Sequence, residues 1–296
     1  MFNSLLPLLK KGDVRSLART LSLVENSVDG YLQFLQTLSS GSIPVLGITG
    51  PPGAGKSTLV DALIGCIVND GKRVGVLCVD PSSPFNLGAL LGDRIRMSHW
   101  YNSEQVFIRS LASRGSLGGL NPKIIELTDV MQQAPFDYII VETVGVGQSE
   151  IEIAGLADIT VVTLVPEAGD EVQTMKAGLM EIADVFVVNK ADRPDAIMFE
   201  KHLRQMLAPA FAKKSIEIPI LKTVASQNTG VDKLYQSIQQ LLTLPKDDLK
   251  KLQLLTEKTF LLIQQKRMAN VDKAELFEYI KASSEDINIY KLIDKY

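Results

Sequence analysis

A glycine-rich stretch early in the chain has the residue types that hold a phosphate chain. Residues 47–65 read GITGPPGAGKSTLVDALIG, and 50–57 fit the pattern G-x-x-x-x-G-K-[ST] between a predicted strand and a predicted helix. The glycines let backbone N–H groups turn toward phosphates, and the helix N-terminus adds partial positive charge. We expect Lys56 to reach the β- and γ-phosphates and Ser57 to ligate Mg²⁺; a turn that binds nothing is the weaker alternative. The expected phosphate-side residues are Gly50, Gly53, Ala54, Gly55, Lys56, Ser57 and Thr58.

A second motif indicates which base the nucleotide carries. Asn189, Lys190 and Asp192 follow the apolar run VFVV as N-K-x-D, which resembles the guanine-specificity motif of GTPases. A carboxylate at 192 can accept from guanine N1–H and the 2-amino group, a donor pair that adenine lacks. We expect Asn189 to brace the loop and the Lys190 stem to lie over the base. In TVAS, residues 223–226, the backbone N–H of Ala225 is the expected contact to guanine O6. An N-K-x-D turn alone arises by chance, but behind a phosphate loop it favours GTP and GDP.

Three carboxylates are candidate Mg²⁺ ligands. Asp80 and Glu142 end apolar runs, and Asp93 lies in LLGDRIRM. The carboxyl ends of parallel strands form the ligand crevice of an open α/β sheet, and Mg²⁺ prefers hard oxygen ligands. Each acid, taken alone, is equally well explained as a helix cap or a surface residue. Gly145 and Gly147 after Glu142 allow a backbone amide to approach the γ-phosphate.

Phosphoryl transfer to water needs charge stabilisation more than covalent chemistry from the protein. The expected catalytic residues are Lys56, Glu142 and Gln148. Gln148 is a candidate for orienting the attacking water, with a purely structural polar role as the alternative. Arg96 and Arg114 are further candidates for phosphate-side charge, although a solvated or paired arginine is the commoner outcome.

The elements that must position these residues are short β-branched apolar runs with helical segments between most of them. They predict a largely parallel sheet covered by helices on both faces, an α/β fold of the P-loop NTPase type. Helical patterns flank it, so we expect a helical segment at 1–42, a GTPase domain at 43–243 and a helical arm at 244–296. The predicted strands are 43–49, 73–80, 105–111, 137–143, 159–165, 185–189 and 218–224.

Composition is that of an ordinary globular protein. Of 296 residues 46% are hydrophobic and 22% charged, and the net charge of −3 gives no electrostatic reason to expect nucleic acid or an anionic membrane as a partner. Cys66 and Cys78 lack metal-type spacing, which favours reduced thiols. No apolar run reaches the roughly 18 to 20 residues of a membrane helix, and the start lacks the order of a signal peptide. We therefore expect a cytoplasmic protein without membrane association.

Several runs together resemble the MeaB/ArgK family of P-loop GTPases, which includes the methylmalonic aciduria type A protein. The resemblance implies a GTPase chaperone for an adenosylcobalamin-dependent acyl-CoA mutase, with GTP hydrolysis gating cofactor loading and protecting the mutase. It also implies that Asp80, Asp93 and Glu142 are metal-site positions and that the C-terminal arm builds a homodimer. The runs that carry it are GDVRSLARTLSLVEN, GITGPPGAGKSTLVDAL, VDPSSPF, LGDRIRM, SRGSLGGL, VETVGVGQSE, GDEVQTMKAGLMEIAD and VNKAD.

Two further segments bear on this resemblance. Residues 166–176, PEAGDEVQTMK, match a third mobile loop that the family uses in signalling to the mutase; a strand-to-helix loop capped by Asp170 would have a similar sequence. Residues 86–93 read NLGALLGD. They correspond to the family's first switch loop, where the sequence SGGSILGD is commoner.

Three other functions stay open at this point. An ATPase or kinase linked to lysine, arginine and ornithine transport is disfavoured, because Asp192 favours the binding of guanine over adenine. A metallochaperone GTPase is disfavoured because His99 and His202 are distant from each other and from both cysteines. A nucleotide-bound scaffold without turnover is the third.

Overall fold

The structure is a computed structural model, and it describes residues 2–80, 97–113, 120–145, 153–168, 182–211, 218–244, 248–268, 270–283 and 287–295. By internal contacts the chain divides into two compact units, Met1–Pro245 and Lys246–Tyr296. Each unit is described by itself.

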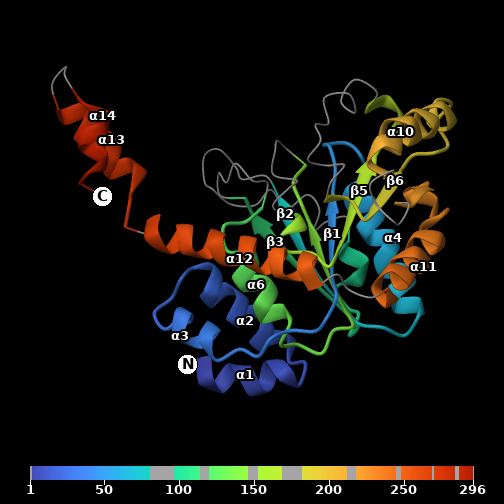
Figure 1. Ribbon diagram of the computed structural model, residues 1–296. Coiled ribbons are helices and arrows are strands. Elements are labelled where there is room, and N and C mark those ends of the chain that lie inside the picture. Colours follow the sequence, from blue (N-terminus) through green and yellow to red (C-terminus); the bar gives the residue numbers. More distant parts are fainter. Residues whose placement is uncertain are drawn as a thin grey trace. The chain divides into compact units, whose positions relative to one another are not determined.

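The first unit is built on a seven-stranded sheet in the order β3-β2-β4-β1-β5-β6-β7, in which every neighbouring pair is parallel (Figure 1). The predicted α/β fold with a mostly parallel sheet is confirmed. Apolar side chains on both faces explain why the strands read as nearly continuous apolar runs. The strands are β1 (Val45–Thr49), β2 (Val74–Asp80), β3 (Val106–Ala112), β4 (Tyr138–Glu142), β5 (Ile159–Leu164), β6 (Val185–Val188) and β7 (Ile220–Lys222).

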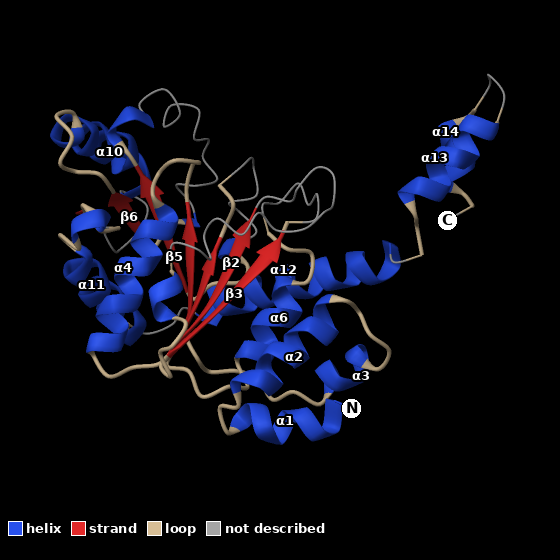
Figure 2. Cartoon of the chain, turned by 180° about the vertical axis from the view of Figure 1, so that it is seen from behind, coloured by secondary structure: helices blue, strands red, loops and turns tan. Residues whose placement is uncertain are grey.

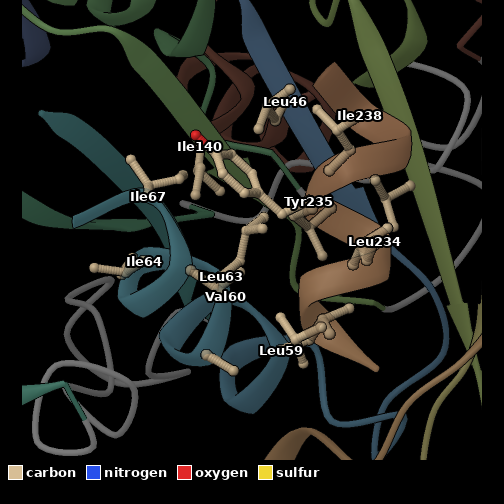
Figure 3. Packing of buried hydrophobic residues seen from close by; sticks show 14 of the residues in the cluster. Leu46, Leu59, Val60, Leu63, Ile64, Ile67, Ile140, Leu234, Tyr235 and Ile238 are labelled. Atoms are coloured by element: carbon tan, nitrogen blue, oxygen red, sulfur yellow. The ribbon is translucent and has the colours of Figure 1, made fainter. Parts of the chain in front are cut away.

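Helices cover both faces of this sheet (Figure 2). Helices α4 (Lys56–Asn69) and α11 (Val231–Thr243) pack on one face, where Leu63 and Leu234 are fully buried in one hydrophobic cluster with Ile140 of β4 (Figure 3). Helix α10 (Ala196–Phe211) packs on the opposite face, through Phe199 and Leu203. Helix α6 (Ile124–Met131) also covers that second face, because a Cβ at Gly75 would meet the Met131 side chain. Residues alternate between the two faces along each strand, so neighbours in sequence serve different helices.

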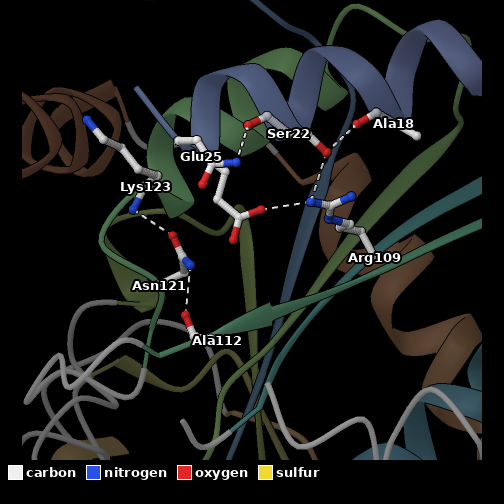
Figure 4. A network of polar contacts seen from close by, with 8 residues as sticks. Ala18, Ser22, Glu25, Arg109, Ala112, Asn121 and Lys123 are labelled. Carbon is white, nitrogen blue, oxygen red and sulfur yellow. Dashed lines mark hydrogen bonds and ion pairs between the residues drawn. The ribbon is translucent and has the colours of Figure 1, made fainter. Parts of the chain in front are cut away.

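The chain begins with helices α1 (Phe2–Lys10), α2 (Val14–Glu25) and α3 (Tyr31–Gln36). Helices α2 and α3 pack against α6, and α1 packs against α2 and α3. Asp13 caps α2 by accepting a hydrogen bond from the Ser16 N–H at 2.7 Å. Arg109 on β3 donates to Glu25 at 2.8 Å and to the Ser22 hydroxyl at 3.2 Å, which ties α2 to the edge of the sheet (Figure 4).

The second unit consists of helices α12 (Asp248–Met268), α13 (Lys273–Ala282) and α14 (Ile289–Ile293). In the parts of the chain that the structure describes, no helix combines the length and apolar character needed to cross a membrane. Short 3₁₀ turns complete the fold at Ser98–Trp100, Pro166–Ala168 and Ala225–Gln227.

Candidate nucleotide-binding site

The glycine-rich loop lies between the end of β1 and the first turn of α4. Gly50 has φ +139°, and a Cβ there would lie 2.0 Å from the Thr163 carbonyl oxygen. Gly55 has φ +83°, and a Cβ there would lie 2.5 Å from the Asn189 side-chain nitrogen. Both positions therefore require glycine, since Thr163 of β5 and Asn189 in the loop after β6 leave no room for a Cβ, and both φ values are positive. The loop has the form that turns backbone N–H groups inward at a helix N-terminus.

Lys56 opens α4 and is buried beneath the loop, with 6% of its surface exposed. Its ammonium donates to the Gly50 carbonyl at 2.9 Å and to the Pro51 carbonyl at 3.1 Å. Gly145, in the loop after β4, has φ +82°, and a Cβ there would lie 2.3 Å from Lys56 Nζ. The loop after β1 and the loop after β4 therefore meet at one lysine.

A serine and two acids gather on the α4 side of the sheet. The Ser57 hydroxyl donates to Glu142 Oε1 at 2.7 Å, and both side chains are buried. Asp80 is 2% exposed. It follows Cys78 by two residues on β2, and Cys78 is paired with Glu142 on the neighbouring strand β4. The Asp80 and Glu142 side chains therefore lie on the same face of the sheet. A hydroxyl and two carboxylates are hard oxygen donors, so this set fits Mg²⁺ better than a softer metal. Among the described residues no cluster of three or more His, Cys, Asp or Glu side chains forms.

The predicted base-reading residues surround the other side of the loop. The Asn189 side chain donates to the Ala54 carbonyl at 3.0 Å and accepts from the Thr223 hydroxyl at 3.0 Å. It also accepts from the Ala225 N–H at 3.1 Å, so this amide, expected to face guanine O6, is engaged by Asn189. One buried amide side chain thus joins the loops that follow β1, β6 and β7.

Lys190 and Asp192 extend this arrangement outward. Lys190 has φ +56° and donates from Nζ to the Gly53 carbonyl at 2.8 Å, so its stem runs alongside the phosphate loop. Asp192 is exposed, as a carboxylate that meets an incoming base must be. Arg193 forms an ion pair with Glu167, which links this loop to the 3₁₀ turn after β5.

Most predicted site residues therefore lie at the carboxyl ends of the strands, and Thr58 lies half-buried in the first turn of α4. Sequence reasoning missed Thr49 and Thr143, whose hydroxyls form a hydrogen bond of 3.0 Å at the ends of β1 and β4. The only signal was that each threonine directly adjoins a motif residue, Gly50 or Glu142. The predicted residues that fall outside the described part of the chain are Asp93, Arg96, Arg114, Gly147, Gln148 and Asp170.

Comparison with known proteins assigns this site to a family. The family described as "Methylmalonyl Co-A mutase-associated GTPase MeaB" matches residues 17–274. The chain belongs to the MeaB family. The resemblance drawn from the sequence motifs is confirmed, and the chain is a P-loop GTPase, a class of protein that binds GTP and GDP.

Individual relatives agree with this MeaB assignment. A putative GTPase from Pyrococcus abyssi is 46% identical over 245 residues, covering 81% of this chain and 76% of that protein. A fused isobutyryl-CoA mutase from Geobacillus kaustophilus is 34% identical over 247 residues, covering 78% of this chain and 23% of that longer protein. The crystal structure of an LAO/AO transport system kinase aligns with a TM-score of 0.66 at 27% identity, covering 94% of this chain and 89% of that one.

Proposed function

We propose that this MeaB-family GTPase is a Mg²⁺-dependent switch that serves an adenosylcobalamin-dependent acyl-CoA mutase. In this role GTP hydrolysis gates cofactor loading and protects the mutase. The observation that carries the proposal is the likeness to part of a fused isobutyryl-CoA mutase, at 34% identity over 247 residues. A GTPase segment within the same chain as a mutase is the arrangement expected when the two activities are coupled.

The residues of the site would divide the work as follows. Lys56 would place its charge on the β- and γ-phosphates, and the amides of the phosphate loop would hold the remaining oxygens. Ser57, Asp80 and Glu142, together with Asp93, would hold Mg²⁺, which when bound neutralises charge that develops between the β- and γ-phosphates. Gly145 would bring its backbone to the γ-phosphate, and Gln148 would orient water.

Guanine recognition would depend on Asp192 and on the loop that Asn189 braces. Asp192 would accept from the two adjacent donors of guanine, and the Lys190 stem would cover one face of the base. Because a bound adenine would cover the Asp192 carboxylate without offering it those donors, adenine would be rejected. We also propose that residues 1–42, 43–243 and 244–296 act as a helical segment, the GTPase domain and a dimerisation arm.

A direct comparison of GTP and ATP binding tests the nucleotide assignment. We expect GTP to bind at least about 100-fold more tightly than ATP, since a site built for two hydrogen bonds discriminates strongly against a base that lacks them. Equal affinities would contradict guanine recognition and favour an ATPase or kinase linked to transport.

The partner assignment is tested by measuring phosphate release with and without a purified adenosylcobalamin-dependent mutase of the same organism. We expect the mutase to change the hydrolysis rate and to co-purify with the GTPase in one nucleotide state. The absence of both effects would contradict the chaperone role while leaving the GTPase assignment intact.

A further inference from the structure

Two buried threonines join the strand ends that lead into the site. Thr49 is the last residue of β1 and Thr143 is the first residue after β4; their exposed fractions are 0% and 2%. Their Oγ1 atoms lie 3.0 Å apart, within hydrogen-bond distance. The Thr143 N–H also donates to the Ile48 carbonyl at 3.1 Å, so the two strand ends are joined by backbone and by side chain.

The pair lies on the opposite face of the sheet from the proposed Mg²⁺ ligands. Ile48 belongs to the core beneath α4, and Glu142 bonds Ser57 of that helix. Because side chains alternate along a strand, Thr49 and Thr143 point away from α4. Each threonine nevertheless adjoins a site residue in the chain, Gly50 in one case and Glu142 in the other.

Packing alone does not require hydroxyls at these two positions. Valine has nearly the shape of threonine, and an apolar pair of the same shape is about as stable as a buried hydrogen-bonded pair. The hydroxyls instead restrict geometry, because a hydrogen bond fixes the separation of the two strand ends more narrowly than apolar contact does. This is the point where the phosphate loop and the Glu142 loop leave the sheet.

We infer that Thr49 and Thr143 are positioning residues for the proposed Mg²⁺–phosphate site. Their hydrogen bond holds the loop that leads to Ser57 and the loop that follows Glu142 at one separation, which keeps both oxygen donors within reach of a single ion. The inference rests on the proposed function, since it assumes that Ser57 and Glu142 act together on Mg²⁺.

The test measures the Mg²⁺ concentration needed for half-maximal binding of a fluorescent, non-hydrolysable GTP analogue, alongside thermal unfolding. In Thr49→Val and Thr143→Val we expect this concentration to rise about tenfold, as expected when one buried hydrogen bond is lost. Thr143→Ser keeps the hydroxyl, so this variant should need nearly the same Mg²⁺ concentration as the wild-type protein. The double valine variant leaves no hydroxyl unpaired, so it should regain thermal stability yet keep the raised Mg²⁺ requirement.

A matched control is Thr20→Val in α2. Thr20 is also fully buried, and its hydroxyl donates to the Ser16 carbonyl at 2.7 Å, far along the chain from either loop. In this variant the Ser16 carbonyl keeps its backbone N–H donor within the helix, so no buried group loses its partner, and the Mg²⁺ requirement should be unchanged. Thr49 and Thr143 variants that behave like Thr20→Val would overturn the inference. A wild-type protein whose analogue binding does not depend on Mg²⁺ would instead contradict the proposed function itself.

Discussion

Gly145, in the loop after β4, lies against the phosphate loop. A Cβ there would lie 2.3 Å from Lys56 Nζ and 2.5 Å from the Gly50 carbonyl oxygen, and the backbone has φ +82°. The lysine tip can move, but the backbone oxygen cannot, so a side chain would force the two loops apart. The close approach at Gly145 therefore requires a residue without a side chain.

We expect Gly145→Ala to lower kcat for GTP hydrolysis by at least about tenfold, because the loop can no longer reach the γ-phosphate side of Lys56. GDP binding should change less, since GDP has no γ-phosphate. Steady-state hydrolysis and GDP titration measure the two effects.

Gly71→Ala is the matched control for backbone strain. Gly71 has φ +72° but no atom within 4 Å of an added Cβ. It should cost about 1–2 kcal/mol of stability without changing hydrolysis. Equal loss of kcat in both variants would show that backbone strain, and not loop approach, is responsible.

In the proposed function, Asp192 selects the base. Asp192→Asn replaces one acceptor oxygen with an N–H₂ donor, which would face the donors of guanine. We expect the affinity for GTP to fall about 100-fold. The affinity for xanthosine triphosphate should rise, because xanthine carries an oxygen where guanine carries its 2-amino group. Competition against a fluorescent guanine nucleotide measures both changes, and an unchanged preference for guanine would remove Asp192 from base recognition.

Among the elements, α10 and β7 are joined by a charged brace centred on Glu200. Glu200 of α10 accepts from Lys222, the last residue of β7, at 2.9 Å and from Arg204 at 3.1 Å. Burial alone would raise the pKa of Glu200, but the hydrogen bonds from Lys222 and Arg204 outweigh it, and the pKa lies below its ordinary value of 4.5. The brace therefore stabilises the fold when Glu200 is ionised.

Glu200→Gln should lower the free energy of unfolding by about 1 kcal/mol at pH 7, the upper range for a partly exposed ion pair. Because the folded-state pKa is lowered, this stabilisation is present above pH 4.5 and is lost as the pH falls through the folded-state value. Urea unfolding of both proteins at pH 7 and at pH 4 or below should give a difference that shrinks with acid. A difference that is constant with pH would mean that the carboxylate charge is not involved.

The strands and the motif loops were predictable from sequence because apolar runs and motif spacing are local patterns. Local properties of the residues also explain the small errors in the predicted strand boundaries. The predicted strands 43–49 and 218–224 begin later in the structure, at Val45 and Ile220, because Pro44 and Pro219 have no N–H to donate to a neighbouring strand. The contact of Thr49 with Thr143 was not predictable, since it depends on β1 lying next to β4. That adjacency is a property of strand order, which local patterns do not contain.

At the level of the whole molecule, the chain divides after Pro245 into a compact unit that contains the described site residues and a helical arm. Large apolar side chains, including Phe277, Ile289 and Tyr290, are exposed on α13 and α14. Exposed apolar surface of this kind is typical of an interaction site, which is consistent with the proposed dimerisation arm.

A protein truncated to residues 1–245 should bind GDP with the affinity of the full chain, because every described contact of the site lies within that range. If the arm builds the dimer, the truncated protein should be monomeric where the full chain is dimeric. Light scattering at matched concentrations measures the difference. A truncated protein that remains dimeric would place the interface elsewhere.

The place of β1 in the sheet has a consequence for how the chain folds as it is synthesised. β1 ends at Thr49, but its neighbours on either side are β4 and β5, which are complete only after Leu164 has been made. During translation the strand that leads into the phosphate loop therefore emerges with both edges unpaired, and its pairing must wait for distant segments. Such non-local pairing slows folding and leaves an apolar strand exposed to misassembly. We therefore expect the nascent chain to depend on ribosome-associated chaperones until its central strand is enclosed.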